Sequence, residues 1–117
     1  MYALRINPQS EKLKRIESLE EDIAQSIEVI LTTPKGAKIF EPEFGSELYK
    51  FIDNVSPSSI PLIIAEVWEA LERWEPRIRL INVDAQRMEM KGSYKLLIKV
   101  EYEIRELSIR KLQEFRF

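Results

Sequence analysis

The sequence contains no histidine and no cysteine. Without cysteine, the chain cannot form a disulfide, a thiolate metal site or a cysteine nucleophile. Without histidine, it lacks the commonest general base and metal ligand at neutral pH. The three glycines are scattered, so the sequence holds neither a P-loop nor a dinucleotide-binding fingerprint. These absences argue against an enzyme, and we expect no cofactor and no bound metal.

An excess of charge of one sign is also missing. The chain has 18 Lys and Arg against 20 Asp and Glu, a net charge of −2. This balance creates no broad field to hold nucleic acid or an anionic membrane. The longest apolar runs, at 62–65 and 96–98, are far shorter than the roughly 20 residues that span a bilayer. We therefore expect no nucleic-acid partner and no membrane insertion.

The length and the apolar content suit a small folded domain. The chain has 117 residues, of which 44% are hydrophobic. This length fits one domain, and the apolar fraction is sufficient for a packed core. We expect a single domain over residues 1–117. The lack of cysteine is compatible with synthesis and folding in a reducing cytosol.

Two segments have the three- and four-residue spacing of an amphipathic helix. The first begins at Ser10 or at Ser18, either of which could cap it, and it ends at Pro34. The second has Ser56 as its expected cap and ends before Pro76. The apolar stripes of the two helices are Ile16, Leu19, Ile23, Ile27 and Ile30, and then Ile60, Ile63, Ile64, Val67, Leu71 and Trp74.

The last third of the chain is typical of strands. Residues 94–105 alternate between apolar and mostly charged side chains, and 78–88 alternate more weakly, with Ile81, Val83 and Ala85 on one face. A turn at 90–93 separates them, and 107–117 form a mixed segment in which Leu112 breaks the parity. A weak strand pattern also covers residues 2–7. The sequence predicts an α+β fold, with two main helices on one face of a small, mostly antiparallel sheet.

The segment 35–55 is irregular but rich in aromatic residues, so we expect it to pack on the core or on a partner. It contains Glu41, Glu43 and Glu47. A glycosidase needs two carboxyl groups across a cleft, so these residues are the candidates for a small carboxylate-dependent glycan hydrolase. A chain with 20 acidic residues contains many such pairs, and solvated loop charges are the simpler interpretation.

The segment 74–78 joins the second helix to the first strand of the expected hairpin. Pro76 bends the chain, Glu75 can accept hydrogen bonds, and the guanidinium of Arg77 can grip a carboxylate with two donors. This pattern suits either a simple helix stop with a surface ion pair or a rigid turn that recognises a partner. In the second case, we expect the Arg77 fork to be free and its truncation to cost little stability.

Four stretches of the chain, in order, resemble the baseplate wedge and sheath-initiator family of contractile phage tails, extracellular injection systems and type VI secretion. They are Ile30-Leu31-Thr32-Thr33-Pro34-Lys35-Gly36, Phe44-Gly45-Ser46-Glu47-Leu48, Ala70-Leu71-Glu72-Arg73-Trp74-Glu75-Pro76-Arg77-Ile78 and the closing strands. The resemblance spans roughly residues 20–105, and the Glu-Pro-Arg tripeptide is the family's hallmark.

The resemblance implies a structural protein with a fold like the handshake domain of sheath subunits. It implies that Glu75, Pro76 and Arg77 dock on a helical bundle of the larger wedge proteins. The adjoining candidates for the same contact are Trp74, Phe44, Gly45 and Ser46. It also implies a ring of usually six copies around the inner tube, beside tube or hub proteins. Assembly in the cytoplasm would then incorporate the protein into a baseplate.

A second contact is expected at the edge of the sheet. A short sheet leaves an edge strand unpaired, and an arm of a sheath subunit can add to it as a further strand. We assign this edge to the last segment, with Ile109, Lys111, Gln113 and Phe115 as the sheath-contacting residues. A small glycan hydrolase and a cytoplasmic adaptor that shares the fold are the alternatives to a baseplate component.

Overall fold

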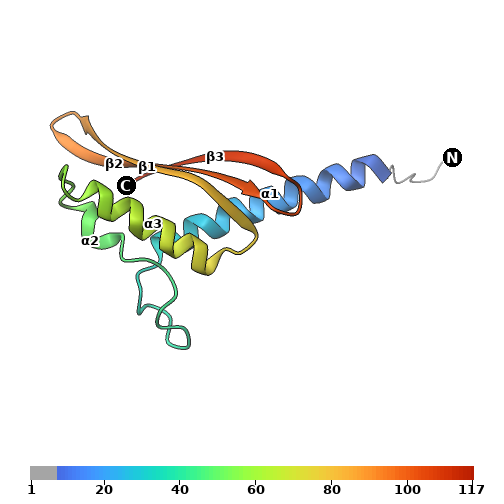
Figure 1. Ribbon diagram of the computed structural model, residues 1–117, viewed down its shortest axis with the longest axis horizontal. Coiled ribbons are helices and arrows are strands. Elements are labelled where there is room, and N and C mark those ends of the chain that lie inside the picture. Colours follow the sequence, from blue (N-terminus) through green and yellow to red (C-terminus); the bar gives the residue numbers. More distant parts are fainter. Residues whose placement is uncertain (1–7) are drawn as a thin grey trace.

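The computed structural model describes residues 8–117, so the strand predicted at 2–7 lies outside the described residues. Three helices, α1 (Pro8–Thr32), α2 (Tyr49–Ile52) and α3 (Ile60–Trp74), precede three strands, β1 (Ile78–Met90), β2 (Ser93–Ile104) and β3 (Ile109–Arg116). The strands form an antiparallel sheet in the order β1-β2-β3. Helices α1 and α3 cover one face of this sheet (Figure 1). The predicted α+β fold is therefore confirmed.

The core lies between the two long helices and the inner face of the sheet. It forms because the apolar stripes of both helices and the apolar face of β2 meet in one layer. Its fully buried members include Ile23, Ile27, Ile63, Val67, Leu71, Leu96, Ile98, Val100, Tyr102 and Ile104. The loop between α1 and α3 contributes Leu48, which is also fully buried. The aromatic-rich loop thus packs on the core in part, as expected.

The ends of both long helices match the prediction, but their starts differ. Helix α1 already includes Ser10 and Ser18, so neither residue caps it. Helix α3 begins at Ile60, with Ser59 rather than Ser56 at its N-cap. The Ser59 hydroxyl donates to the Ser56 carbonyl oxygen (2.8 Å) and accepts from the Ser56 N–H (2.9 Å), which closes a separate turn. Because this local hydrogen bonding holds residues 56–59 in a turn, the helix begins only at Ile60.

The β1–β2 hairpin turns through Lys91 and Gly92, whose φ angles of 47° and 81° are both positive. Two such residues fit a two-residue type I′ turn, which matches the twist of the strands. Near the other end of β1, the pairing register shifts between Leu80 and Asn82. This β-bulge reverses the parity, so Leu80 and Val83 are both buried while Ile81 is only half-buried. The predicted face for Ile81 is wrong for this reason.

Strand β2 follows the predicted alternation except at two residues near its start. Tyr94 was expected to face the helices but is 55% exposed, and the Arg87 guanidinium lies 4.0 Å from the centre of its ring. Leu97 falls on the charged face yet is buried, because it lies in the central strand with Gln86 and Arg116 as its paired neighbours. The hairpin tip thus extends past the helices.

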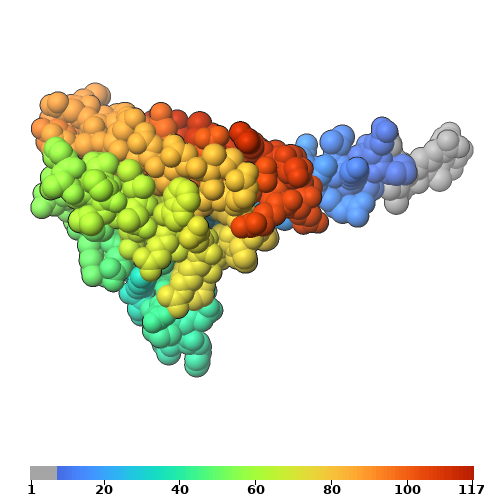
Figure 2. All heavy atoms as spheres, in the orientation of Figure 1, coloured from blue at the N-terminus to red at the C-terminus, as the bar shows by residue number. Residues whose placement is uncertain are grey.

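Two parts of the chain project from the body. The N-terminal half of α1 continues beyond the sheet, and the loop between α1 and α2 descends away from the helices (Figures 1 and 2). The molecule is accordingly elongated, with extents of 64 × 38 × 24 Å. Within residues 8–117, even the 25-residue α1 is not apolar enough to be a membrane-crossing helix.

Candidate docking site

The corner between α3 and β1 is built around the carboxylate of Glu75. Helix α3 ends at Trp74, and Pro76 cannot continue it because proline lacks an N–H. The Glu75 side chain is only 2% exposed. Such burial of a charge is costly unless the charge is paired and hydrogen-bonded. The corner therefore needs a partner for Glu75.

That partner is Arg77, two residues along the chain. Its Nε and Nη2 donate to the two Glu75 carboxylate oxygens at 2.7 and 2.8 Å, and its backbone N–H donates to Oε1 at 3.2 Å. Its Nη1 donates to Asp22 Oδ2 of α1 at 2.7 Å. The expectation of a free Arg77 fork is wrong, because the guanidinium joins the corner to α1. Pro76 is exposed, and 39% of the Arg77 side chain remains accessible.

Electrostatics agree with this geometry. Burial raises the pKa of Glu75, but hydrogen bonds from Arg77 and Ser26 outweigh burial, so the pKa falls below its usual value. The hydrogen bonds to Glu75 and Asp22 raise the pKa of Arg77 in turn. Both groups are thus held in their charged forms. A general acid needs the opposite shift at its carboxyl group, so Glu75 is not suited to that role.

The Phe44-Gly45-Ser46 segment fixes the base of the projecting loop. Gly45 has a φ of 106°, and a Cβ there would lie 2.1 Å from the carbonyl oxygen of Thr33. Ser46 is buried, and its hydroxyl donates to the carbonyl oxygen of Leu31 at 2.9 Å. Gly45 and Ser46 therefore support the loop from inside and present little surface to a partner.

Phe44 and Trp74 bring the loop base and the corner together. Their rings meet edge to face with centroids 5.1 Å apart, a favourable arrangement for an aromatic pair. Trp74 Nε1 is buried with no hydrogen-bond acceptor within the described chain. Beside this pair, Arg73 forms an ion pair with Glu43 of the loop. Phe44 and Trp74 therefore lie together at the end of α3 beside Glu75, whereas Gly45 and Ser46 lie at the base of the loop, against Thr33 and Leu31.

Strand β3 is an edge strand, as predicted, because it pairs only with β2 among the described strands. Its predicted contact residues, however, turn their side chains toward α1. Lys111 Nζ lies 3.1 Å from a carboxylate oxygen of Glu20, and Gln113 Nε2 donates to the carbonyl oxygen of Ala24 at 3.1 Å. Phe115 is 7% exposed. These side chains hold the sheet to the helix.

The backbone N–H groups of β3 point alternately toward β2 and toward the open edge of the sheet. Phe117 and Leu96 exchange both backbone hydrogen bonds, at 2.9 and 3.1 Å. Hydrogen bonding in an antiparallel ladder alternates along each strand. The N–H groups of Ile109, Lys111, Gln113 and Phe115 therefore point toward β2.

The groups on the outer edge belong to the alternate residues Arg110, Leu112, Glu114 and Arg116. A strand that adds to β3 would bond to these four residues. Leu112, the apolar residue that interrupts the alternation of this segment, is 64% exposed and lies on the outer face of the sheet.

The loop carboxylates proposed for glycan hydrolysis lie beside cations or in solvent. Glu43 pairs with Arg73, and Glu47 lies 3.4 Å from Lys50 Nζ. Glu41 is exposed. Over residues 8–117, no three acidic side chains converge into a group that could hold a metal ion.

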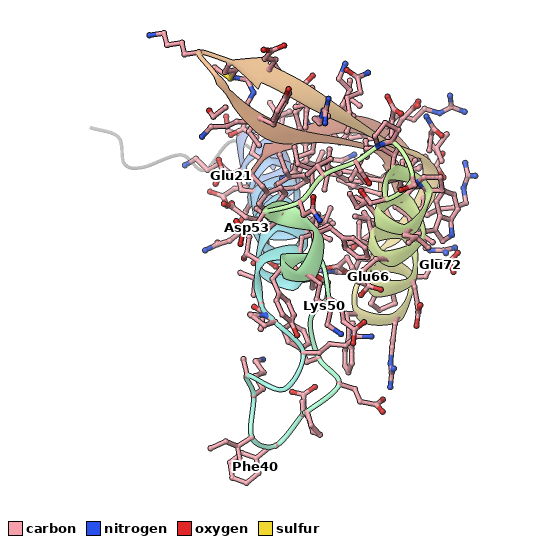
Figure 3. All side chains as sticks on the ribbon, turned by 90° about the vertical axis from the view of Figure 1, so that its left-hand side faces the viewer. Glu21, Phe40, Lys50, Asp53, Glu66 and Glu72 are labelled. Atoms are coloured by element: carbon pink, nitrogen blue, oxygen red, sulfur yellow. The ribbon has the colours of Figure 1, made fainter. Side chains whose placement is uncertain are left out.

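Sequence reasoning missed the residues that hold this site from a distance. Asp22 and Ser26 reach the Glu75–Arg77 pair from α1. Glu66 of α3 accepts the backbone N–H of Glu47 at 2.7 Å and so anchors the loop (Figure 3). Charged residues on an amphipathic helix give no signal of such contacts, because their partners lie 19 to 55 residues away in the sequence.

The fold and the corner define a class: a small α+β domain with two helices on one sheet face and an open strand edge. The family model for the baseplate wedge protein gp25 matches residues 17–107. The chain belongs to this family. The predicted resemblance is thus confirmed.

Two phage proteins are similar in sequence. Baseplate protein W of Escherichia phage P2 is 37% identical over 68 residues, which cover 57% of this chain and 59% of that protein. Baseplate wedge protein gp25 of Enterobacteria phage T4 is 28% identical over 83 residues, which cover 70% of this chain and 61% of that protein. The match thus spans about 60% of the length of each curated relative.

Three solved structures are similar. A Geobacter sulfurreducens protein, provisionally named a tail lysozyme, is 34% identical with a TM-score of 0.75, over 98% of this chain and 95% of its own. A chain of the postcontracted pyocin R2 baseplate is 39% identical with a TM-score of 0.59, over 71% and 84%. A chain of a type VI secretion baseplate complex, at 16% identity, a TM-score of 0.56 and coverage of 92% and 96%, shares the fold.

Proposed function

We propose that this protein is a structural baseplate component that docks on the wedge core bundle and starts sheath polymerisation around the inner tube. Family membership supports the baseplate role, and the relatives in the pyocin and type VI structures are parts of baseplates. Several copies, usually six in this family, would form a ring next to tube or hub proteins. Assembly would take place in the cytoplasm before incorporation into a phage tail or an injection particle.

The observation that carries the sheath role is the open edge of β3. Its outward N–H and C=O groups have no strand beside them in the described chain. Such an edge invites pairing with another chain, and proteins normally protect it. An extended sheath arm would satisfy these groups, with main-chain hydrogen bonds as the source of affinity. The edge is thus suited to the first sheath subunit.

The corner is the proposed contact with the wedge proteins. Pro76 and the accessible part of Arg77 form its surface, while Glu75 holds the arginine plane in one orientation. A guanidinium held in place by two bonds is preorganised to meet a further acceptor on a partner. Trp74 and Phe44 pack together next to this surface, and Gly45 and Ser46 shape the loop that carries Phe44. Glu75 therefore acts through Arg77 in this proposal.

We propose no catalytic activity, although one similar protein carries a lysozyme name. Glu43 and Glu47 both lie beside cations, and the pKa of Glu75 is lowered. Purified protein should leave a peptidoglycan suspension turbid. Clearing that is lost in Glu43→Gln or Glu47→Gln would contradict this and favour the hydrolase.

The sheath role is tested by removing one outward N–H from β3. Leu112→Pro deletes such a group at an edge position, where proline is tolerated. We expect the variant to fold but to give bare tubes instead of sheathed ones in electron micrographs. Leu112→Ala, which keeps the N–H, should assemble sheath normally. Full-length sheath on folded Leu112→Pro protein would show that the sheath docks elsewhere.

A proline at a residue whose N–H points toward β2 provides a second control. Gln113→Pro removes an N–H that points toward β2, together with the bond from Gln113 to α1. We expect this variant to lose stability, as measured by circular dichroism on heating. The pair of prolines thus separates damage to the outer edge from damage to the fold.

The docking role is tested at the exposed proline. Pro76→Ala should remain folded but should retain less of the wedge proteins in a pull-down. Pro57→Ala, at another exposed proline outside the corner, is the matched control. Equal retention by both variants would remove Pro76 from the contact. If neither wedge nor sheath proteins bind the native chain, an adaptor function takes precedence.

A further inference from the structure

The part of α1 that runs beside β3 carries acidic side chains and no basic ones. Residues 16–32 include five acidic residues and no lysine or arginine. Glu20 is already paired with Lys111 of β3. Asp22 is already paired with Arg77 at the corner. The remaining three are exposed and form no ion pair with any described residue: Glu17, Glu21 and Glu28.

These three residues form one stripe along the helix, which we call the acidic stripe. Glu17, Glu21 and Glu28 occupy positions i, i+4 and i+11, which share a helix face. Ala24 lies in the same stripe at i+7, and its carbonyl oxygen accepts a hydrogen bond from Gln113 of β3 at 3.1 Å. Figure 3 shows Glu21 on the side of α1 that faces away from α3. The acidic stripe therefore borders β3 on the side of its open edge.

A hollow lies where the acidic stripe meets the end of β3. It has a volume of about 200 Å³, and its walls are Glu28 and Thr32 of α1 and residues 113–117. Glu114 and Arg116, whose N–H groups point outward, belong to these walls. The hollow thus adjoins the open edge and has Glu28 as its acidic side.

A strand added to β3 would place every second side chain over the acidic stripe. Neighbouring strands lie about 4.8 Å apart, and successive side chains of a strand point to opposite faces of the sheet. One set of side chains would therefore face α1. Two residues of a strand rise about 6.6 Å, close to the roughly 6 Å that separate Glu17 from Glu21 along the helix. Basic side chains at alternate positions would thus meet these carboxylates.

The outer face of β3 offers no comparable selection by charge. Arg110 and Arg116 lie there together with Glu114. Glu114 already lies 4.0 Å from Lys99 of β2, and Arg110 stands opposite Glu103 in the strand pairing. Charges of both signs are thus present on this face. Selection by charge is expected only on the face toward α1.

We propose that the sheath arm that adds to β3 carries basic residues at alternate positions, on the side that faces α1. The proposal rests on the proposed function, because it describes the arm that would start the sheath. The open edge requires a strand, and the acidic stripe determines its charge. Main-chain hydrogen bonds give affinity at such an edge, while alternate side chains give specificity. An arm with acidic residues in these positions would be repelled.

Two short peptides test the charge preference on the full chain. One alternates lysine with threonine, and the other alternates glutamate with threonine. We expect the lysine peptide to bind the native protein in fluorescence anisotropy, and the glutamate peptide to bind about 10-fold more weakly or worse. The double variant Glu21→Lys/Glu28→Lys should weaken binding of the lysine peptide by about 10-fold.

The matched control makes the same change of net charge on α3. Glu69→Lys/Glu72→Lys alters two exposed residues, and Figure 3 shows Glu72 on the opposite side of the molecule from Glu21. This variant should bind the lysine peptide like the native chain. Equal loss in both double variants would overturn the proposal, since binding would then depend on net charge alone. Equal binding of the two peptides by the native chain would also overturn it.

Leu112→Pro shows whether the peptide uses the open edge. We expect this variant to bind the lysine peptide more weakly than Leu112→Ala, because it lacks one outward N–H. Equal binding by these two variants would overturn the proposal, and circular dichroism checks that each is folded. Sheath assembly is a separate readout. Bare tubes with Leu112→Pro but no preference between the peptides would keep the sheath role and remove the charge preference. Sheathed tubes with Leu112→Pro would remove the sheath role even if the peptides behave as expected.

Discussion

The corner around Glu75 and the loop tip at Ile39–Phe40 both lie at the surface, but they differ in how their groups are satisfied. At the corner, a carboxylate that is 2% exposed receives three hydrogen bonds from Arg77. At the loop tip, two large apolar side chains have almost no protein around them. The polar groups of the corner are therefore satisfied within one chain, whereas the apolar side chains of Ile39 and Phe40 are left in water.

This difference shows that a family hallmark can act first within its own chain. The Glu-Pro-Arg tripeptide joins α3, β1 and α1 before it can contact any partner. Its loss would thus reduce the stability of the fold, apart from any effect on the proposed docking contact. Ile39 and Phe40 have no such internal role, so substitutions there should leave stability almost unchanged. Substitutions in the two regions can test this contrast, from the largest expected effect on stability to the smallest.

The largest effect is expected at the loop base. Gly45→Ala should lower the free energy of unfolding by about 3 kcal/mol or more, because it combines a positive φ with a clash against the Thr33 carbonyl. Denaturant titration measures the loss. Gly36→Ala has a similar φ of 92° but open space around the new Cβ, so it should lose only about 1–2 kcal/mol. Equal losses for the two variants would show that the Thr33 carbonyl moves away from the new Cβ at position 45.

Arg77→Ala should cost about 2 kcal/mol of stability, well above the small loss expected for a free surface arginine. The value lies below that of a fully buried pair because 39% of the Arg77 side chain is exposed. Urea unfolding provides the measurement. Asp22→Asn removes only the exposed partner and should cost less than about 0.5 kcal/mol. If Arg77→Ala melts like the native chain, Glu75 must find another partner.

Acid should weaken the corner more than the rest of the fold. The pKa of Glu75 lies below its ordinary value of 4.5, so the contribution of Glu75 to stability is complete above pH 4.5 and is lost as the pH falls through the lowered pKa. Glu75→Gln should therefore flatten the decline in stability below pH 4.5. Parallel acid curves for the native and variant chains would contradict this linkage.

The smallest effect on stability is expected at the extremities. Phe40→Ser and Leu13→Ser should each change the free energy of unfolding by less than about 0.5 kcal/mol, because both side chains are mostly in water. Thermal melting at low protein concentration checks this. A large loss in either variant would mean that the contrast between corner and extremities does not hold.

Several features followed from the sequence because local physics determines them. The helix ends at Thr32 and Trp74 follow from the nearby prolines, which cannot continue a helix. The alternation of β2 predicted its buried face from Leu96 onward, and the turn at Lys91–Gly92 closed the hairpin. The fold class and the edge position of β3 also followed from the sequence.

Other features depended on the tertiary structure, because they involve residues far apart in the chain. The bulge after Leu80 reversed the face of Ile81, and the end of the helical layer left Tyr94 in water. Local sequence cannot report where a neighbouring element stops.

The sequence by itself determined that Glu75, Pro76 and Arg77 form a rigid turn with one acceptor and one forked donor. Only the tertiary structure decided that three of the five guanidinium N–H groups are already bonded, because Glu75 is buried beside Arg77 and Asp22 approaches from 55 residues away. The same holds for β3: the broken alternation of the last segment predicted an edge strand, but the pairing with β2 decided which N–H groups face outward. Short-range steric rules determine turns and periodicity, whereas long-range packing decides which polar groups remain available.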